Sequence, residues 1–212
     1  MTACIHIKKS DFLTRTVQYL MLNGSFVDNP GLLTGKMGIV IFLYHYSCYT
    51  NDTTYREFAG ELLDEVIEEI HAETSVGFAS GLCGIAWGIL HLIEHSFVDA
   101  DPDEVLSDID QAIMKYDVRK ITDTSLHTGL LGIAHYMFQR KNVDTVYMQE
   151  LIENMESRNI QIPDNNSLLK KVVENIEIRD DVFKQKLPLL CIAHNGIAGM
   201  GLKLLFESNE RH

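Results

Sequence analysis

The sequence repeats one short motif four times: a glycine, two residues, a second glycine, and then an apolar run. The paired glycines of the four copies are Gly35 and Gly38, Gly81 and Gly84, Gly129 and Gly132, and Gly196 and Gly199. Successive first glycines are 46, 48 and 67 residues apart. A period in this range, with each copy opening a helix, predicts stacked or circularised helical hairpins. Such an arrangement brings equivalent helix ends to one centre, where a functional site is expected.

Two kinds of helix alternate along the chain. Helices that begin at the glycine motif are mostly apolar, and the sequence places them at 36–49, 82–95, 130–140 and 197–207. The other predicted helices have one charged face and lie at 10–22, 53–71, 102–116, 144–157 and 167–178. Apolar helices are expected inside and amphipathic helices outside. We therefore predict an all-α fold in one domain over 1–212: a toroid-like α/α arc, or incomplete barrel, of about four hairpins near 31–72, 77–117, 125–158 and 190–208.

Paired glycines at the start of a helix have a physical reason. They lie on one helix face, allow another backbone to come close, and relax the dihedral angles where a loop becomes a helix. A glycine inside a helix costs about 1 kcal/mol relative to alanine. That cost, repeated at four equivalent places, indicates a packing constraint or a site, and both alternatives stay open.

Composition and charge restrict the partners. The formal net charge of −12 argues against a nucleic-acid partner, which requires clustered Lys and Arg, and favours a cationic or neutral ligand. The first eleven residues lack a signal-peptide pattern, and the longest apolar stretch, 38–46, is less than half of a membrane span. The sequence therefore predicts a cytoplasmic protein with no membrane partner. The scattered cysteines, which are Cys4, Cys48, Cys83 and Cys191, are expected to be reduced thiols.

The glycine motifs resemble those of the lanthionine synthetase C-like family, in particular its Bacteroidetes-type members. The segments that carry the resemblance begin at Gly31, Phe78 and Ser125: Gly-Leu-Leu-Thr-Gly-Lys-Met-Gly-Ile, Phe-Ala-Ser-Gly-Leu-Cys-Gly-Ile-Ala-Trp-Gly-Ile and Ser-Leu-His-Thr-Gly-Leu-Leu-Gly-Ile. The resemblance covers about 31–206. It implies an α/α toroid, although family members have more hairpins and about twice this length, so the chain looks like a short or incomplete version.

The resemblance also implies a role in the maturation of ribosomally made peptides. Family cyclases hold zinc through two Cys and one His just before the glycines of late repeats. The zinc deprotonates a substrate cysteine thiol. The thiolate then adds to a dehydrated Ser or Thr and closes a thioether ring.

This sequence departs from the family at the implied zinc site. The two family cysteine positions, counted from the glycines, hold His127 and His194, and the family histidine position holds Asn195. Ser80 stands where the family has a histidine that assists acid–base chemistry, and no residue matches the catalytic aspartate.

Two interpretations of His127 and His194 remain. In one, they cap helix N-termini or bond to loop carbonyls. In the other, they form a rebuilt zinc site in which Cys191 or Cys83 supplies a third ligand, since imidazole is a good zinc ligand.

Three other strings resemble known sites less well. His91-Leu-Ile-Glu94-His95 matches a zinc-peptidase pattern, but it lies about 10–16 Å down its helix, away from the glycine end. A histidine at a helix C-terminus suits the helix dipole. The aspartates of 99–110 lack the glycine of a calcium loop, and Asp101-Pro102 is more typical of a helix start. The segment 31–37 has the wrong spacing for a phosphate-binding loop.

Two functions therefore remain open from the sequence. One is a thioether-forming peptide cyclase that uses His127 and His194, with Cys191 or Cys83, as zinc ligands. The alternative is a zinc-free scaffold that holds a peptide or a partner protein in the concave centre of the arc, or that pairs with a second copy of itself to complete the ring.

Overall fold

The elements of this computed structural model are helices joined by loops, and 63% of the residues that the structure describes are helical. The structure describes residues 8–71, 73–161, 164 and 167–209, so Cys4 lies outside it. The prediction of an all-α fold is confirmed. The α-helices are α1 (Lys9–Asn23), α2 (Lys36–Thr50), α3 (Thr53–Glu68), α4 (Leu82–Glu94), α5 (Pro102–Met114), α6 (Leu130–Met137), α7 (Thr145–Ser157), α8 (Leu168–Glu174) and α9 (Ile197–Asn209).

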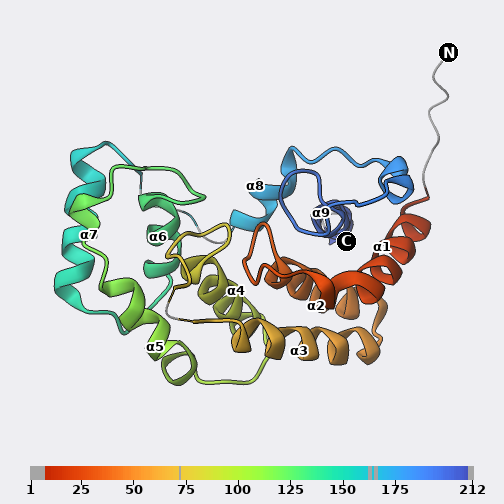
Figure 1. The fold of residues 1–212 in the computed structure, drawn as a ribbon, viewed down its shortest axis with the longest axis horizontal. Helices are drawn as coiled ribbons and strands as arrows, with labels where there is room; N and C mark the ends of the chain where they lie inside the picture. The colour runs from red at the N-terminus through yellow and green to blue at the C-terminus, as the bar shows by residue number, and fades with distance from the viewer. Residues whose placement is uncertain (1–7, 72, 162–163, 165–166, 210–212) are drawn as a thin grey trace, which may run out of the picture.

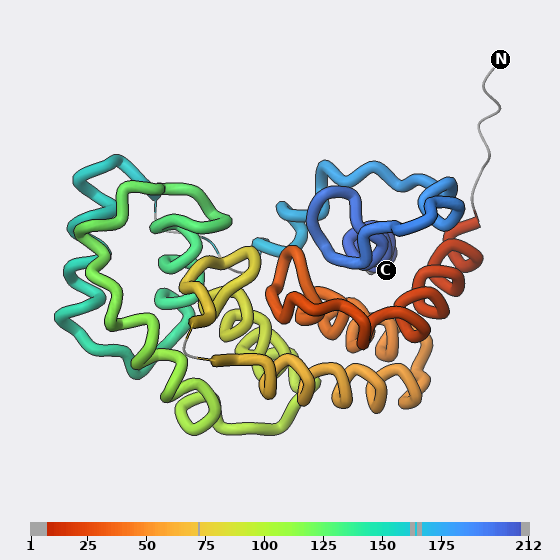
Figure 2. The backbone as a smooth tube through the Cα atoms, in the orientation of Figure 1, coloured from red at the N-terminus to blue at the C-terminus, as the bar shows by residue number. Residues whose placement is uncertain are grey.

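The four helices that follow the glycine motifs form the inner row of an arc. Their spatial order is α6, α4, α2 and α9, because α4 packs on α6, α2 packs on α4, and α9 packs on α2. Figure 1 shows α5, α6 and α7 at one end of the arc and α1 and α9 at the other. The tube in Figure 2 shows that the end of the chain returns beside its beginning. The fourth copy of the motif therefore neighbours the first, not the third.

Each inner helix has an outer partner. Helix α3 packs on α2, α5 on α4, and α7 on α6, so three hairpins follow one another along the chain. The fourth inner helix, α9, packs against α1, from the start of the chain, and against α8. The fourth unit is thus not a sequential hairpin over 190–208. It is closed by the first helix of the chain.

Burial separates the inner helices from the outer ones as their sequences predict. In α4 all residues from Leu82 to Leu92 are buried, and Trp87 is among the largest side chains of the core. The outer helix α3 buries one stripe, which consists of Ala59, Leu62, Leu63 and Val66. That spacing of three and four residues is the pattern of a helix with one face on the core.

Helix ends agree with the sequence at α5 but not at α1. The Asp101 side chain accepts a hydrogen bond from the Asp103 amide at 2.9 Å, with Pro102 at the first helical position, as predicted. Helix α1 begins at Lys9, one residue before the predicted range 10–22, and its N-cap, Lys8, makes no side-chain capping bond. The Ser10 hydroxyl bonds to the neighbouring Asp11 carboxylate.

Helix α8 is shorter than the predicted 167–178. It ends at Glu174, where a lysine from α9 binds the last carbonyl of the helix and one beyond it. The Lys203 ammonium donates to the Glu174 carbonyl at 2.7 Å and to the Ile176 carbonyl at 2.8 Å. A cation at a helix C-terminus satisfies carbonyls that have no partner within the helix.

A buried ion pair fixes the second hairpin against the third. The Arg140 guanidinium, after α6, donates to one carboxylate oxygen of Asp110 on α5 through Nε at 3.0 Å and Nη2 at 2.7 Å. The Tyr136 hydroxyl donates to the other oxygen of the same carboxylate. Because the Asp110 side chain is buried, removal of Arg140 would leave an uncompensated carboxylate in the core, whereas Arg140 also pairs with the Asp103 carboxylate at 3.0 Å.

We predict that Gly84→Ala destabilises the fold severely, while Gly60→Ala does not. A Cβ atom at Gly84 would lie 1.8 Å from the Phe78 carbonyl oxygen and 3.0 Å from the Leu32 Cβ atom. A Cβ atom at Gly60, within α3, meets only the Tyr44 hydroxyl, at 3.9 Å. In urea unfolding, Gly84→Ala should lower the free energy of unfolding by about 3 kcal/mol. Gly60→Ala should raise it by about 0.5–1 kcal/mol. Equal effects would contradict the packing described.

Candidate functional site

The loops that precede the glycine helices share one backbone geometry. We call them loop 1 (29–35), loop 2 (75–81), loop 3 (123–129) and loop 4 (189–196). In each, the first amide of the helix bonds back to the carbonyl at the start of the loop. These bonds run from Lys36 to Asn29 at 2.7 Å, from Leu82 to Ser75 at 2.8 Å, from Leu130 to Asp123 at 2.9 Å, and from Ile197 to Leu189 at 2.8 Å.

Each loop folds back so closely that the glycine at its end, the first glycine of the motif, has no room for a side chain. A Cβ atom at Gly35 would lie 2.1 Å from the Asn29 carbonyl oxygen, and one at Gly81 would lie 2.1 Å from that of Ser75. The backbone at Gly35, Gly81 and Gly129 is extended, with negative φ. The glycines are therefore required by the close approach of each loop's own backbone, not by a special dihedral angle.

Side chains repeat the pattern in loops 1 and 3. The Asn29 side chain accepts from the Gly31 amide at 2.8 Å, and the equivalent Asp123 accepts from the Ser125 amide at 2.8 Å. The residue just before the first glycine, Thr34 or Thr128, bonds to the same Asn or Asp side chain. The Thr128 hydroxyl and the Ser125 groups hold the pKa of Asp123 below its usual value. These bonds tie both ends of each loop together.

The four loops are hydrogen-bonded to one another in series. The Ala193 amide of loop 4 donates to the Leu33 carbonyl of loop 1 at 2.8 Å. The Leu33 amide donates to the Ala79 carbonyl of loop 2 at 2.8 Å, and the Ala79 amide donates to the His127 carbonyl of loop 3 at 3.0 Å. The motifs thus do converge on one rim, which runs in the order 4, 1, 2 and 3. Loops 3 and 4 are its two ends.

Loop 4 is one residue longer than the others. Its closing bond spans eight residues, from Ile197 to Leu189, where the other three loops span seven. Two consecutive residues with positive φ, His194 and Asn195, take up the extra length. Ala193 is the residue through which loop 4 joins the bonds between loops, and His127 is the residue through which loop 3 joins them. His194 is therefore not the structural equivalent of His127, although both stand two residues before a glycine.

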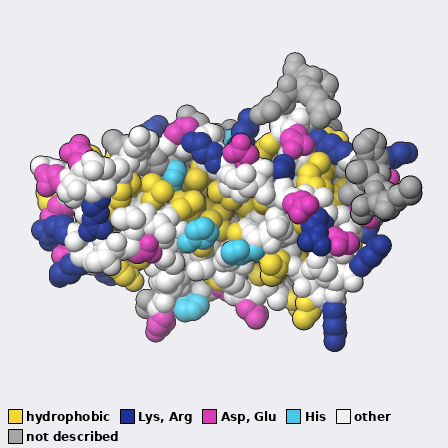
Figure 3. All heavy atoms as spheres, turned by 90° about the horizontal axis from the view of Figure 1, so that it is seen from above, with side chains coloured by type: hydrophobic (Ala, Val, Ile, Leu, Met, Phe, Trp, Pro, Cys, Tyr) yellow, Lys and Arg dark blue, Asp and Glu magenta, His cyan; other side chains and the backbone are white. Residues whose placement is uncertain are grey.

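The side chains of the rim's two ends are exposed. His127 and Thr128 face solvent at the loop 3 end, as do His194 and Asn195 at the loop 4 end. The Asn195 side chain accepts a bond from the Glu177 amide at 3.2 Å. His194 and Asn195 also line a cavity of about 150 Å³ together with Arg179 and Met200. Figure 3 shows a face of the molecule on which histidine and hydrophobic side chains gather near the middle.

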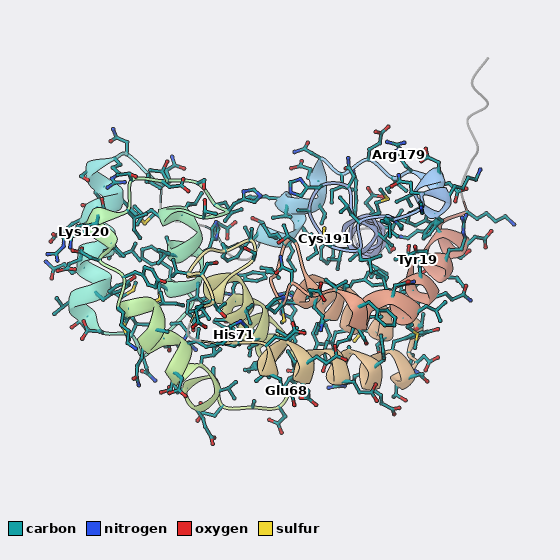
Figure 4. All side chains as sticks on the ribbon, in the orientation of Figure 1. Tyr19, Glu68, His71, Lys120, Arg179 and Cys191 are labelled. Carbon is teal, nitrogen blue, oxygen red and sulfur yellow. The ribbon has the colours of Figure 1, made fainter. Side chains whose placement is uncertain are left out.

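The predicted cysteine ligands lie apart from the rim histidines. Cys83 is completely buried within α4, and burial raises the pKa of its thiol far above its usual value. Cys191, labelled in Figure 4, lies in loop 4, where its Sγ atom donates to the Ala193 carbonyl at 3.3 Å. His127 lies at the opposite end of the rim. Within the part of the chain that the structure describes, no group of three His, Cys, Asp or Glu side chains is arranged to hold a metal ion.

A second cluster lies at the other end of the inner helices. His91 and His95 are in the last turn and at the C-cap of α4, away from the glycine end as predicted, and His95 Nδ1 lies 2.9 Å from the His91 carbonyl oxygen. Sequence reasoning missed their partner, His45 of α2, whose Nε2 atom lies 3.1 Å from His91 Nε2. The His91 ring also stacks on Trp87. The only sequence signal for His45 was that it stands at the same distance from its glycine motif as His91 does from its own.

Both facing histidines are uncharged at neutral pH. Burial, together with the nearby His95, lowers the pKa of His45 to about 4. Burial, with His95 and His45, lowers that of His91 to about 2. Two neutral imidazoles can share one N–H between their facing nitrogens, whereas two charged rings would repel.

One comparison with known proteins identifies the family. The family profile described as "Lanthionine synthetase C-like protein" matches residues 27–209. This chain belongs to the lanthionine synthetase C-like family. No curated protein and no solved structure matches it. The matched range includes all four glycine loops and the helices from α2 to α9.

The zinc implied by this family does not fit the residues present. His127 and His194 stand at opposite ends of the rim, separated by loops 1 and 2. The Cys83 thiol is sealed in the core, and the Cys191 thiol is bonded to its own loop. These four side chains do not form one ligand set. Separately, no helix within the described residues is long and apolar enough to cross a bilayer.

We predict that His45→Gln reduces the loss of stability in acid. A histidine titrates near pH 6.5 in the unfolded chain. Since the folded pKa of His45 is lower, the unfolded state binds more protons below pH 6.5, and the free energy of unfolding falls as the pH falls. At pH 5 this amounts to about 2 kcal/mol for a histidine whose folded pKa is about 4. Urea unfolding at pH 7 and 5, followed by Trp87 fluorescence, measures the change.

The exposed His71 provides the control for this experiment. His71→Gln should lose as much stability between pH 7 and 5 as the unmodified protein, whereas His45→Gln should lose less. The same loss in all three proteins would show that His45 is not buried as an uncharged ring.

Proposed function

We propose that this member of the lanthionine synthetase C-like family binds peptides during their maturation without forming the thioether itself. The observation that supports this proposal is the separation of His127 and His194 at the two ends of the loop series. The residues that would have to hold a thiol-activating zinc therefore do not meet. The same rim presents exposed polar side chains that a bound peptide can reach.

The chemistry of thioether formation explains why this separation matters. A cysteine thiol has a pKa near 8.5, so at neutral pH it is mostly protonated and weakly nucleophilic. A catalyst must stabilise the thiolate and deliver a proton to the carbon next to the attacked one. Because the two carbons are adjacent, the groups that perform these tasks must lie close together around one peptide segment. A single exposed histidine at each end of the rim does not supply that arrangement.

The rim offers polar contacts to a peptide, and the charge of the protein disfavours an anion. Exposed hydroxyl, amide and imidazole groups at Thr128, Asn195, His127 and His194 offer both donors and acceptors to an extended backbone. The formal charge of −12 repels acidic ligands and attracts basic ones. We therefore propose a peptide that carries lysine or arginine near its reactive cysteine.

One experiment tests binding and chemistry together. A fluorescein-labelled peptide that contains dehydroalanine, cysteine and flanking lysines is mixed with protein purified without a histidine tag, with and without one equivalent of Zn²⁺. Anisotropy measures binding, and mass spectrometry after thiol alkylation measures ring closure. The lysine peptide should bind, more weakly at high salt, and it should cyclise no faster than it does without protein. A matched peptide with glutamates in place of the lysines should not bind.

Two results would contradict the proposal. Failure of the lysine peptide to bind would remove the binding role. Faster ring closure that His127→Ala or His194→Ala abolishes would show an active cyclase that uses these histidines.

Pairing with a second copy to complete the ring stays a prediction. Sedimentation at high protein concentration tests it: a concentration-dependent dimer supports pairing, and a monomer throughout contradicts it.

A further inference from the structure

A small cavity lies at the loop 4 end of the proposed peptide-binding rim and opens to solvent there. It measures about 150 Å³, and residues from the 3₁₀ helix η3 (Asp180–Lys184) and its two caps, from loop 4 and from α9 line it. Two of them, His194 and Asn195, are the positive-φ residues that take up the additional length of loop 4. The rim therefore continues into a cavity at the one loop whose length differs from that of the others.

One wall of the cavity is a single face of η3. Arg179, Val182 and Gln185 all line the cavity and are spaced three residues apart. Because a 3₁₀ helix has three residues per turn, residues at this spacing lie on one face. Phe183 of the same helix packs on Phe12 of α1, with the ring centroids 5.3 Å apart. The wall is therefore held against the outer helix of the fourth unit, and it does not need a ligand to form.

The deepest part of the cavity is apolar. Val182 and Met200 are 3% and 1% exposed, and both belong to the hydrophobic core. Leu189 of loop 4 adds a third apolar side chain and is 53% exposed, so an apolar part of the wall can be reached from solvent. An apolar group that enters the cavity leaves water for apolar surroundings, which is favourable in proportion to the area that it buries.

The charges around the cavity do not favour an ionic ligand. The Arg179 guanidinium forms an ion pair of two bonds with Asp181, at 3.1 Å from Nε to Oδ1 and 2.8 Å from Nη2 to Oδ2. An anion would have to compete with this carboxylate. None of the described residues that line the cavity carries a carboxylate to receive a cation. The Asn195 side-chain oxygen already accepts from the Glu177 amide at 3.2 Å.

We propose that this cavity binds one apolar side chain of about the size of leucine. The inference rests on the proposed function, because the side chain belongs to a peptide whose backbone meets the exposed polar groups of His194 and Gln185 at the mouth. The volume sets the size: an apolar cavity of about 150 Å³ holds benzene, which is slightly bulkier than a leucine side chain. Alanine would leave most of this space to water, and glutamate would place a charge against apolar walls.

Matched peptides measure this selectivity on the full-length protein. In the fluorescein-labelled lysine peptide, a leucine is moved through every position that is not lysine, cysteine or dehydroalanine. Each leucine peptide is compared with the peptides that have alanine or glutamate at the same position. At its best position, leucine should improve the affinity at least about tenfold over either replacement, because it buries three more carbon atoms than alanine does.

Met200 reports on the cavity itself. Protein labelled with ¹³C at its methionine methyl groups gives a signal for this residue, which Met200→Leu removes and thereby assigns. N-acetyl-leucinamide, added alone, should shift this signal in a saturable way, and N-acetyl-alaninamide should not. This measurement does not depend on the affinity of a peptide for the rim.

Two leucines of the same segment provide matched variants. Leu189 lines the cavity, whereas Leu187 is 86% exposed and does not line it. Leu189→Asn keeps the approximate size of the side chain but makes the wall polar, and it should reduce the preference for leucine over alanine to less than about threefold. Leu187→Asn should leave the preference unchanged.

The outcomes separate this inference from the proposed function. Equal affinity of all leucine and alanine peptides would overturn the inference and leave peptide binding intact. A Met200 signal that N-acetyl-leucinamide does not shift would also overturn it, because water alone would then fill the cavity. Equal effects of Leu189→Asn and Leu187→Asn would place the leucine outside the cavity, with the same consequence. If no peptide binds but N-acetyl-leucinamide shifts the Met200 signal, the rim loses its proposed role and the cavity keeps its selectivity.

Discussion

The backbone bonds between the glycine loops are the constraint on which the rest of this structure depends. Leu33 of loop 1 and Ala79 of loop 2 each use both their carbonyl and their amide, whereas loop 4 contributes the amide of Ala193 and loop 3 the carbonyl of His127. Because such bonds require close approach, the loops must be tightly folded. Because the loops are tightly folded, the first glycine of each motif cannot be replaced by a residue with a side chain. The helices that follow are then held side by side with their N-termini on one rim.

This series determines the shape of the molecule and the distribution of its sites. It places the last inner helix beside the first, so that the start of the chain supplies the outer helix of the fourth unit. It also separates loops 3 and 4, which carry the exposed histidines. At the opposite ends of the same helices, equal spacing along α2 and α4 brings His45 against His91. One architecture thus yields a polar rim at one end of the inner helices and a histidine cluster at the other.

Sequence reasoning succeeded where a repeated pattern expressed a repeated physical need. The glycine spacing and the alternation of apolar and amphipathic helices predicted the inner row, the outer layer and the convergence of the loops. The capping of α5 by Asp101 followed from local chemistry alone. The family resemblance, drawn from the same motifs, agrees with the matched profile.

The failures all involve contacts between segments distant in sequence. Counting back from Gly196 equated His194 with His127, but the additional residue of loop 4 appears only in its bond to loop 1. Helix α9 packs on α1, and Lys203 of α9 binds the last carbonyl of α8. Both contacts depend on the path by which the C-terminal part of the chain comes back to these helices. His45 carried no motif of its own. No local pattern in a single sequence encodes these neighbours.

Hydrogen exchange at individual loop amides tests the central claim most directly. The amides of Leu33, Ala79 and Ala193 lie outside regular helices, yet each donates to the neighbouring loop. The account predicts that they exchange at least about a thousandfold more slowly than unprotected amides, whereas the amide of the exposed Thr124 exchanges freely. Exchange of all three at the rate of Thr124 would show that the loops are not bonded in series, and the order of the helices would lose its basis.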